Sequence, residues 1–565
     1  MEKLYKISLY AVKFLTLLLA VLLFAGSFLT TCYADNMETQ QVLFRLDNPL
    51  WNLLELAGFG LLFCACLHFY DKFGRKFRRG LLIFTLGFIF CLGVLLILFG
   101  RTVPAADAMS VYNAALEWIQ GNLDVIHPTV SYLSYYPQQI GLMAFLELFL
   151  RIWNLTGISA PAWHFIKLIY VCLLCAAVLF QYLSLKYLWR EHWEEISCCY
   201  LLLVCCNLPM IMYSSFVYGE IPSFAALSVG LYLLLRLLSG ITFPGCASDI
   251  SCKGMSVKPF ASEVSSETIL SPKLHCTRSA FFTGTGSILF LALSVMLRKN
   301  SLIPIIAVLL VLLFESLRFG RSVHARLCLL GMAVCLAVTS VGILPLVQKC
   351  YEKKAGNTLS SGVTAMSYFA MGMQEASRGC GWYNGFNIDT YDAAGMDSAL
   401  TNEISRQAVL ERLAYFRGHP GYAVDFYARK HLSQWADGTY ASRQATLATY
   451  GGRSGFFQEV YDGSLSSAYI EWGNAWQDVL YLGTLVFCVS TVHRKRKNTA
   501  TAPQGSDTDS LYLSLYLYVG LIAVLGGFLF HILWEANSRY IFLYSLLLMP
   551  YCAAGVYTVF AEHAK

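Results

Sequence analysis

The stretch 81-LLIFTLGFIFCLGVLLILFG-100 holds no charged side chain over its whole length. A helix needs about 20 mainly apolar residues to cross the hydrocarbon core of a bilayer, so this stretch is long enough to span a membrane. The rest of the 565-residue chain is similar, with 57% hydrophobic and only 13% charged residues, whereas soluble domains carry about 25% charged residues. We therefore expect an all-α polytopic membrane protein. Disordered, collagen-like, coiled-coil and small disulfide-rich secreted chains are excluded.

Apolar segments recur along the chain and predict its spans. They cover residues 8–32, 50–70, 81–100, 138–154, 163–185, 196–218, 221–239, 280–297, 301–317, 327–348, 474–492, 511–533 and 540–560. Basic loops, which favour the cytoplasmic side, lie at residues 72–79, 186–190, 318–326 and 494–497. If every one of these segments crossed the membrane, the first and the last basic loop would lie on opposite sides. All four loops lie on one side only if one segment does not cross. The best candidate is 138–154, which is short and carries Glu147 and Arg151. We expect this segment to lie at the outer interface, which leaves about 12 spans with both termini inside.

This arrangement divides the chain into four parts. We expect an N-terminal pair of spans at 1–80 and a transmembrane core at 81–348, which includes a long outer loop at 101–162. Residues 349–473 have ordinary polar composition and predict a folded external domain, and 474–565 hold the last spans. Most of the 19 cysteines fall in apolar segments, where Cys behaves as a small hydrophobe. A disulfide between Cys350 and Cys380 is compatible with the sequence but is not fixed by it.

Charged residues near the membrane gather at one interface. With the topology above, these boundary charges all fall at or near the outer face: Glu55, Lys167, Glu220, Arg298, Lys299, Glu535 and Arg539. A carboxylate at the bilayer centre would cost about 2.5–3.5 kcal/mol on insertion scales. Transporters usually keep ionisable groups at that depth. The pattern therefore favours chemistry on a lipid headgroup at the outer leaflet over a solute pathway.

The first long outer loop contains Asp107 directly before an amphipathic pattern. Apolar residues then recur with the spacing of one helix face, at Val111, Ala114, Ala115, Trp118 and Ile119. This spacing predicts a helix along the membrane surface that begins near Asp107. Asp107 is then either the N-cap of that helix or a carboxylate that faces outer-leaflet headgroups. A polar aromatic turn, Tyr135-Tyr136-Pro137-Gln138-Gln139, leads into the interfacial segment.

These features together resemble the GT-C superfamily of integral-membrane glycosyltransferases, in particular bacterial members similar to the protein-mannosyltransferases of family 39. The resemblance continues in three short motifs at expected outer ends of spans: Met212-Tyr-Ser-Ser-Phe-Val-Tyr-Gly-Glu220-Ile-Pro222, Leu297-Arg-Lys-Asn-Ser-Leu-Ile-Pro304 and Trp534-Glu-Ala-Asn-Ser-Arg539-Tyr540. Two features depart from the family. Two extra spans precede the loop that contains Asp107, and the acidic pair usual in that loop is a single Asp107 here. The departure leaves open whether a divalent metal takes part.

The resemblance implies an enzyme that moves a sugar from a polyprenyl-phosphate-linked donor to an acceptor hydroxyl, with inversion at the anomeric carbon. It implies an active site on the outer side of a plasma membrane and an acceptor that is a glycan, a protein or a lipid, with no role for nucleic acid. The implied catalytic residues are Asp107, as general base, and Glu220. The implied substrate-binding residues are Tyr136, Gln138, Arg298, Lys299, Glu535, Arg539 and Tyr540. No metal ligand is assigned.

Several of these residues also have a purely structural interpretation. Glu220 could cap the helix that contains Pro222. Arg298 and Lys299 could be interface anchors whose charges reach toward water. Glu535 and Arg539 are four residues apart and could form a salt bridge within one helix. The tryptophans of the external domain are expected in its core, whereas the turn-rich stretch 379–385 could lie near the active site.

Three other functions compete with the transferase. A flippase or exporter of lipid-linked sugars would need polar residues at mid-membrane depth. A polymerase or ligase of lipid-linked glycans would use a longer donor. A non-catalytic scaffold would need no ionised base at Asp107.

Overall fold

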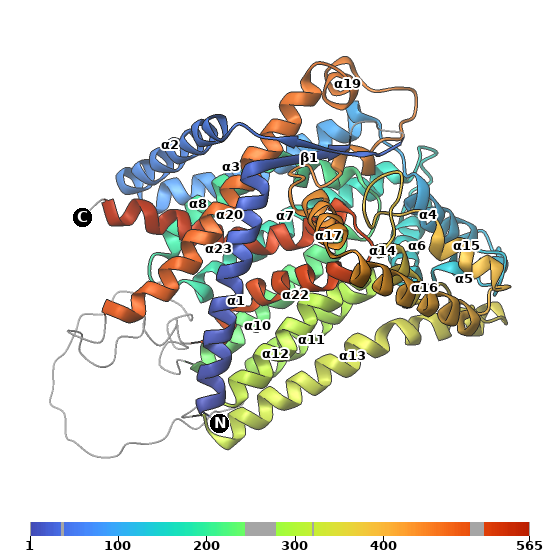
Figure 1. Cartoon of the computed structure of the whole chain (residues 1–565). Coiled ribbons are helices and arrows are strands. Elements are labelled where there is room, and N and C mark those ends of the chain that lie inside the picture. Colours follow the sequence, from blue (N-terminus) through green and yellow to red (C-terminus); the bar gives the residue numbers. More distant parts are fainter. Residues whose placement is uncertain (1, 35–38, 243–277, 319–320, 498–513, 564–565) are drawn as a thin grey trace.

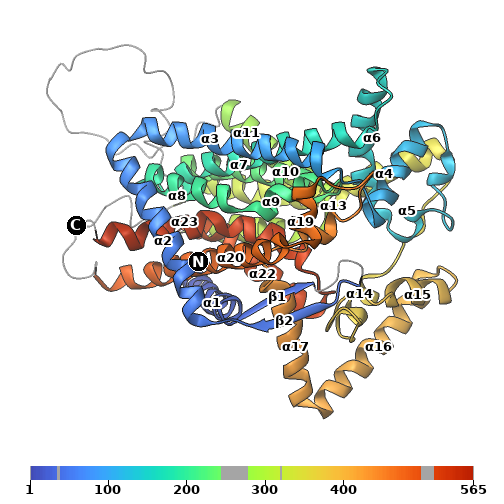
Figure 2. The same cartoon turned by 90° about the horizontal axis from the view of Figure 1, so that it is seen from above.

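The computed structural model describes residues 2–34, 39–242, 278–318, 321–497 and 514–563. Long helices form a bundle, and shorter helices gather at one end of it (Figures 1 and 2). The only sheet in the described residues is a two-stranded hairpin. This architecture is the all-α arrangement that the composition predicts.

Eleven helices or helix pairs in the described residues are long and apolar enough to cross a membrane. They are α1 (Glu2–Leu29), α2 (Pro49–Phe73), α3 (Arg75–Leu95) with η1 (Leu96–Gly100), α7 (Trp163–Leu188), α10 (Glu220–Thr242), α11 (Arg278–Leu297), η6 (Lys299–Ser301) with α12 (Leu302–Ser316), α13 (Val323–Ala355), α20 (Leu465–Lys497), η7 (Leu515–Tyr518) with α22 (Val519–Leu533), and η8 (Ser538–Ile541) with α23 (Phe542–His563). Helix α8 (Trp193–Cys206) and the segment of α9 (Leu208–Met212) and η4 (Tyr213–Ser215) form a twelfth candidate, bent by 63°. The prediction of about 12 spans is confirmed.

The segment expected at 138–154 forms α6 (Ile140–Leu155), which is too short to be counted among the spans. It packs against α4 (Ala106–Ile119) in the outer loop. The loop also contains η2 (Leu123–Val125), α5 (Tyr132–Tyr135) and η3 (Pro137–Gln139). Leu148, Ile152 and Leu155 are exposed along α6, as expected for a helix that faces lipid at the interface.

A hairpin follows the first helix, where the sequence had predicted a continuous apolar segment to residue 32. Strand β1 (Thr30–Ala34) pairs antiparallel with β2 (Val42–Leu46). The hairpin is bound to the region after α13, because Cys32 N donates to Ala436 O (2.8 Å) and Val42 N donates to Arg378 O (2.8 Å). The N-terminal spans therefore contribute to the same end of the bundle as residues 356–464, which follow α13 and are called the external segment here after their predicted location.

The predicted external domain begins and ends inside helices. Helix α13 continues to Ala355, where Gly356 in the left-handed conformation (φ 70°) ends it, and α20 begins at Leu465. Six helices lie between them: α14 (Ala365–Gly372), α15 (Phe386–Ala393), α16 (Ser398–Gly418), α17 (Pro420–Trp435), α18 (Ser442–Ala445) and α19 (Gly455–Asp462). Several of them pack directly on the spans, so this segment covers the end of the bundle (Figure 2).

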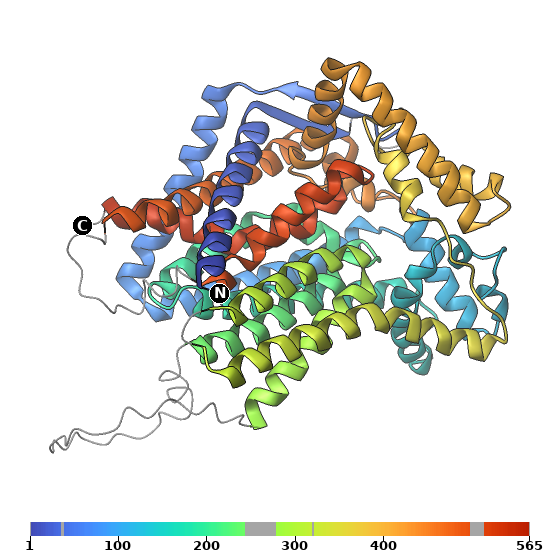
Figure 3. The same cartoon turned by 60° about the horizontal axis from the view of Figure 1, so that its bottom comes forward.

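Hydrogen bonds at the two ends of the bundle agree with alternate crossing. At one end, Glu315 of α12 accepts from Tyr5 OH (2.9 Å) and from Leu515 N (2.9 Å), and α1 packs beside α22 (Figure 3). At the other end, Asn474 Nδ2 donates to Thr31 Oγ1 (2.6 Å). The starts of α1 and η7 and the end of α12 thus share one side. Cys350 and Cys380 are free thiols, so the disulfide compatible with the sequence is not formed.

The topology can be tested at Cys350, which is exposed near the C-terminal end of α13, the end that the predicted topology places outside. We expect a membrane-impermeant maleimide to label Cys350 in intact cells, because its thiol lies beyond the apolar part of the helix. The labelling should be lost in Cys350→Ser. If Cys350 were labelled only after the membrane is permeabilised, the end of the bundle that contains Asp107 would face the cytoplasm. That result would contradict the predicted topology.

Candidate functional site

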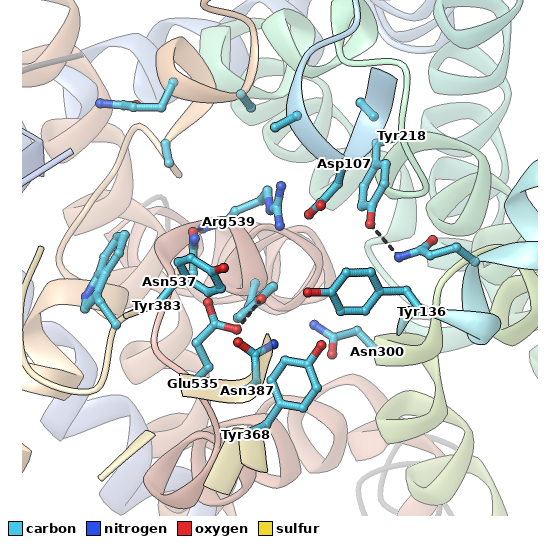
Figure 4. Close-up of a pocket in the computed structure, with 18 of the residues that line it drawn as sticks. Asp107, Tyr136, Tyr218, Asn300, Tyr368, Tyr383, Asn387, Glu535, Asn537 and Arg539 are labelled. Carbon is cyan, nitrogen blue, oxygen red and sulfur yellow. Dashed lines mark hydrogen bonds between the residues drawn. The ribbon is translucent and has the colours of Figure 1, made fainter. Parts of the chain in front are cut away.

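A cavity of about 840 Å³ lies at the end of the bundle that α4–α6, the hairpin and the external segment share (Figure 4). Eight of the nine residues singled out from the sequence line it: Asp107, Tyr136, Gln138, Arg298, Lys299, Glu535, Arg539 and Tyr540. Glu220 does not line the cavity. Segments more than 400 residues apart in the chain thus contribute charged groups to one space.

Asp107 is held by a strained and tightly bound loop. The residue before it, Ala106, has φ 46°, and Arg101 has φ 47°, both in the left-handed region that disfavours L side chains. Val103 N donates to Ala448 O (2.9 Å), and the buried Lys167 Nζ donates to Thr102 O. The backbone around Asp107 is therefore fixed from two sides, by the external segment and by α7.

The carboxylate of Asp107 points into the cavity, in the direction of Arg539 and Tyr136 (Figure 4). The interpretation of Asp107 as an N-cap is wrong, because the N-cap of α4 is Ala105 and Asp107 lies in the first helical turn. Within the part of the chain that the structure describes, no hydrogen bond or ion pair engages the Asp107 carboxylate. A partly buried carboxylate left without a partner is suited to accept a proton from a bound molecule.

Glu220 lies behind the cavity wall, between two arginines. Its Oε1 is 2.9 Å from Arg298 Nη2 and 3.6 Å from Arg539 Nε, and its side chain is only 3% exposed. The approach of α10 to the end of α11 requires a glycine at position 219, since a Cβ there would lie 2.5 Å from Leu297 O. The sequence assigned Glu220 to catalysis; in the structure it lies outside the cavity lining and beside two arginines, an arrangement suited to a counter-ion of these cations.

Arg298 and Lys299 occupy the break between α11 and α12. Arg298 is extended (φ −157°), which ends α11 and lets η6 begin a new direction. Ser223 Oγ lies 2.6 Å from Ser301 Oγ and thereby holds this break against α10. Both cations line the cavity, and Arg298 is paired with Glu220 rather than extended toward the membrane surface, which its interpretation as a simple interface anchor would require.

Glu535 and Arg539 do not form the salt bridge that their spacing allows. Glu535 lies before η8, and Arg539 turns to Glu220 instead. Glu535 accepts a hydrogen bond from Tyr540 OH (3.0 Å). Burial raises the pKa of the Glu535 carboxyl to about 7, against the opposite effect of the Tyr540 hydrogen bond. The cavity therefore contains a carboxyl group, that of Glu535, which changes charge near neutral pH.

The aromatic turn before α6 is covered by the external segment. Val363 N donates to Tyr135 O (3.0 Å), and Gly362 (φ 73°) comes so close that a Cβ would lie 2.4 Å from Pro137 Cδ. Tyr136 faces Asp107 and Glu535 across the cavity (Figure 4). Gln139 Nε2 donates to Tyr218 OH (2.5 Å), which fixes a further aromatic ring on this wall.

Much of the lining comes from residues that the sequence did not single out. They are Tyr33 and Gln40 of the hairpin, Asn300 after Lys299, and Tyr368, Arg378, Asn387, Asp437 and Gln444 of the external segment. The turn-rich stretch 379–385 was expected near the active site, and Trp382 and Tyr383 do line the cavity. Trp382 is also buried, with its indole N–H donating to Ser433 Oγ (2.8 Å), which agrees with the core role expected for tryptophan here.

Lys430 of α17 binds the external segment to the loop that carries Glu535. The side chain is fully buried, and its Nζ donates to Gly372 O (2.5 Å) and to Ile532 O (3.0 Å). Burial lowers the pKa of Lys430 to about 7. Nearby, Ala536 N donates to Gly381 O (2.7 Å). The position of Glu535 therefore depends on the docking of the external segment.

No group of three His, Cys, Asp or Glu side chains that could hold a metal ion is found among the described residues. Three carboxyl groups, Asp107, Asp437 and Glu535, line the cavity, but they are not grouped closely enough to form such a site. The residues thus do not fit a bound divalent metal, and the chemistry considered below uses only the side chains of the chain.

No family model and no curated protein matches this sequence. Solved structures show an overall likeness. The apo oligosaccharyltransferase of Archaeoglobus fulgidus matches with a TM-score of 0.43 and 13% identity, over 87% of this chain and 51% of that chain. AglB of the same organism, in complex with an inhibitory peptide and a dolichol-phosphate, matches with a TM-score of 0.44 and 13% identity over the same shares. The chain thus spans about half the length of these structures. At TM-scores this low, the site has to be interpreted from its own residues.

The carboxyl group of Glu535 predicts a pH-dependent affinity for anions. Its pKa is raised to about 7, so the group is neutral below that pH and negative above it. We expect sulfate, which does not titrate in this range, to bind about threefold to tenfold more weakly as the pH rises from about 6 to 8. In Glu535→Gln this change in sulfate affinity with pH should become smaller. The change that remains should come from the titration of Lys430, whose pKa is also about 7. If the sulfate affinity of the variant changed with pH as much as that of the wild type, Glu535 would not face the bound anion.

The counter-ion role of Glu220 predicts a loss of stability. Glu220→Gln leaves two arginines without their buried carboxylate, which costs about 3–5 kcal/mol when one partner of a buried pair is removed. Thermal unfolding in detergent should show a clear drop in Tm, whereas the exposed Glu117→Gln should unfold like the wild type. An unchanged Tm together with lost activity would instead support the catalytic role that the sequence suggested.

Proposed function

We propose that this protein is a glycosyltransferase that moves a sugar from a polyprenyl-phosphate-linked donor to an acceptor hydroxyl at the outer face of the membrane. The observation that carries the proposal is the cavity that Asp107, a carboxylate without a partner among the described residues, lines together with three cations on the ends of spans. The resemblance of the outer-loop motifs to family 39 of the GT-C superfamily supports the donor class. The plasma membrane and a bacterial-type cell envelope are part of the same proposal.

Asp107 acts as the general base. The acceptor oxygen attacks the anomeric carbon while its proton passes to the Asp107 carboxylate, and the bond between that carbon and the phosphate oxygen breaks. Attack opposite to the leaving phosphate inverts the anomeric centre. General-base assistance of this kind contributes about 10²–10⁴-fold to the rate.

The cations stabilise the departing lipid phosphate. Arg298 and Arg539 are oriented by Glu220, and Lys299 is adjacent to Arg298 on the same break. Guanidinium groups bind phosphate oxygens in a bidentate manner, and fixed charges aimed at a developing anion lower the barrier most effectively. Glu220 is thus a positioning residue. Tyr136, Gln138, Glu535 and Tyr540 line the same space and are assigned to the sugar.

The transferase is favoured over a flippase or exporter by the location of the charged groups. The charged residues of the cavity lie on span ends, the outer loop and the external segment. Movement of a headgroup across the bilayer would need polar groups along the spans. A polymerase or ligase of lipid-linked glycans would differ from the proposed transferase in using a longer donor.

The general-base role predicts the effect of Asp107→Asn. The variant keeps the shape of the side chain but cannot take a proton, so we expect transfer to fall by about 10²–10⁴-fold with an unchanged Tm. Mass spectrometry of surface glycans in a deletion strain complemented with each variant measures this. Asp124→Asn, an exposed carboxylate of the same loop, is the matched control. Wild-type glycans with Asp107→Asn would support a scaffold or transporter.

A further inference from the structure

One cation of the cavity has no part in the proposed phosphate site. Arg378 lies on the loop between α14 and α15, whereas Arg298, Lys299 and Arg539 lie on span ends. Arg298 and Arg539 share Glu220, but no ion pair or side-chain hydrogen bond engages the Arg378 guanidinium among the residues that the structure describes. Arg378 is half-buried, and a charge withdrawn from water without a partner is costly unless a ligand supplies one.

The backbone that carries Arg378 is rigid. Its carbonyl accepts from Val42 N of the hairpin (2.8 Å), and the turn is closed by Ala376 N donating to Gly379 O (3.2 Å). Glu375 and Cys380 form an isolated antiparallel bridge across the same turn. The guanidinium therefore projects from a fixed platform, and a preorganised donor binds an anion with little ordering cost.

The groups around Arg378 are polar and aromatic, and the Glu535 carboxyl lies within electrostatic range of its guanidinium. Its guanidinium lies 5.7 Å from the centre of the Tyr383 ring, an arrangement that favours a cation through the face of the ring. Tyr33 and Gln40 of the hairpin line the same cavity and add uncharged polar groups. A guanidinium with such neighbours suits bidentate binding of a phosphate or a carboxylate.

Tyr383 connects this region with Asp107. Burial raises the pKa of the Tyr383 phenol, the carboxylates of Asp107 and Glu535 raise it further, and Arg378 lowers it. Tyr383 is thus within electrostatic range of both Asp107 and Arg378. Asp107, Tyr383 and Arg378 line one cavity, so that one molecule can present a hydroxyl to Asp107 and an anionic group to Arg378.

We propose that Arg378 binds an anionic group of the acceptor, a phosphate or a carboxylate, and so selects acidic acceptors. The assignment to the acceptor rests on the proposed function, because it assumes that the cations on the span ends hold the donor phosphate. The cavity then has two anion subsites, one for the donor at Arg298, Lys299 and Arg539, and one for the acceptor at Arg378.

Two probes test this assignment on the purified full-length protein in nanodiscs. With sulfate, we expect two binding events per chain in the wild type, of which Arg378→Gln loses one and Lys299→Gln weakens the other. With a polyprenyl phosphate, followed by native mass spectrometry, Lys299→Gln should reduce binding at least tenfold and Arg378→Gln should leave it within about twofold of wild type. Arg417→Gln, an exposed arginine of α16, is the matched control.

The outcomes separate the two proposals. Sulfate binding unchanged in Arg378→Gln would overturn the second subsite, since the charge would then be satisfied within the chain. Polyprenyl phosphate lost in Arg378→Gln would assign Arg378 to the donor and also overturn it. Unchanged polyprenyl phosphate binding in Lys299→Gln would count against the donor site alone. Methyl phosphate and acetate are then compared as competitors of the sulfate that binds at Arg378. Stronger competition by methyl phosphate indicates a phosphate on the acceptor, and stronger competition by acetate indicates a carboxylate.

Discussion

The buried carboxylate of Glu220 is the interaction on which the site depends. It begins α10, and its two partners come from the break between α11 and α12 and from the start of η8. A carboxylate withdrawn from water must be paired, and each arginine must be paired in turn, so the three span ends can pack only in one arrangement. That arrangement aims two guanidinium groups into the cavity. Fixed cations at one end of an apolar bundle suit an anion held at the membrane surface, which is the role we propose for them.

The external segment and the spans each supply part of the lining of the cavity. The spans contribute most of the cations, whereas the external segment and the hairpin contribute mainly aromatic and amide side chains, together with Arg378 and Asp437. Lys430 joins the two parts, because its buried ammonium binds main-chain carbonyls of α14 and α22 together. The external segment also holds the strained backbone at Ala106, because the loop before Asp107 is hydrogen-bonded to residues near 448. Docking of the segment therefore positions the carboxyl groups of Asp107 and Glu535.

The sequence was sufficient for the spans and for the side of the bundle on which the charges meet. Length and hydropathy give the spans, and an even number of crossings brings Asp107, Arg298 and Arg539 to the same end without any knowledge of packing. The pairing of these charges could not be predicted. A lone charge at a span boundary has the same pattern whether it faces a cavity, as Asp107 does, or a buried partner, as Glu220 does. The hairpin was missed because its first strand, Thr30–Ala34, continues the apolar character of α1.

The central claim is that side chains from distant parts of the chain handle one sugar-linked lipid phosphate at the outer leaflet. A cryo-EM structure of the protein with a polyprenyl-phosphate-linked sugar tests it most directly. We predict density for the phosphate within hydrogen-bond distance of Arg298, Lys299 or Arg539, with the sugar between the phosphate and Asp107. A phosphate bound elsewhere, or an Asp107 carboxylate turned away from the sugar, would contradict the account.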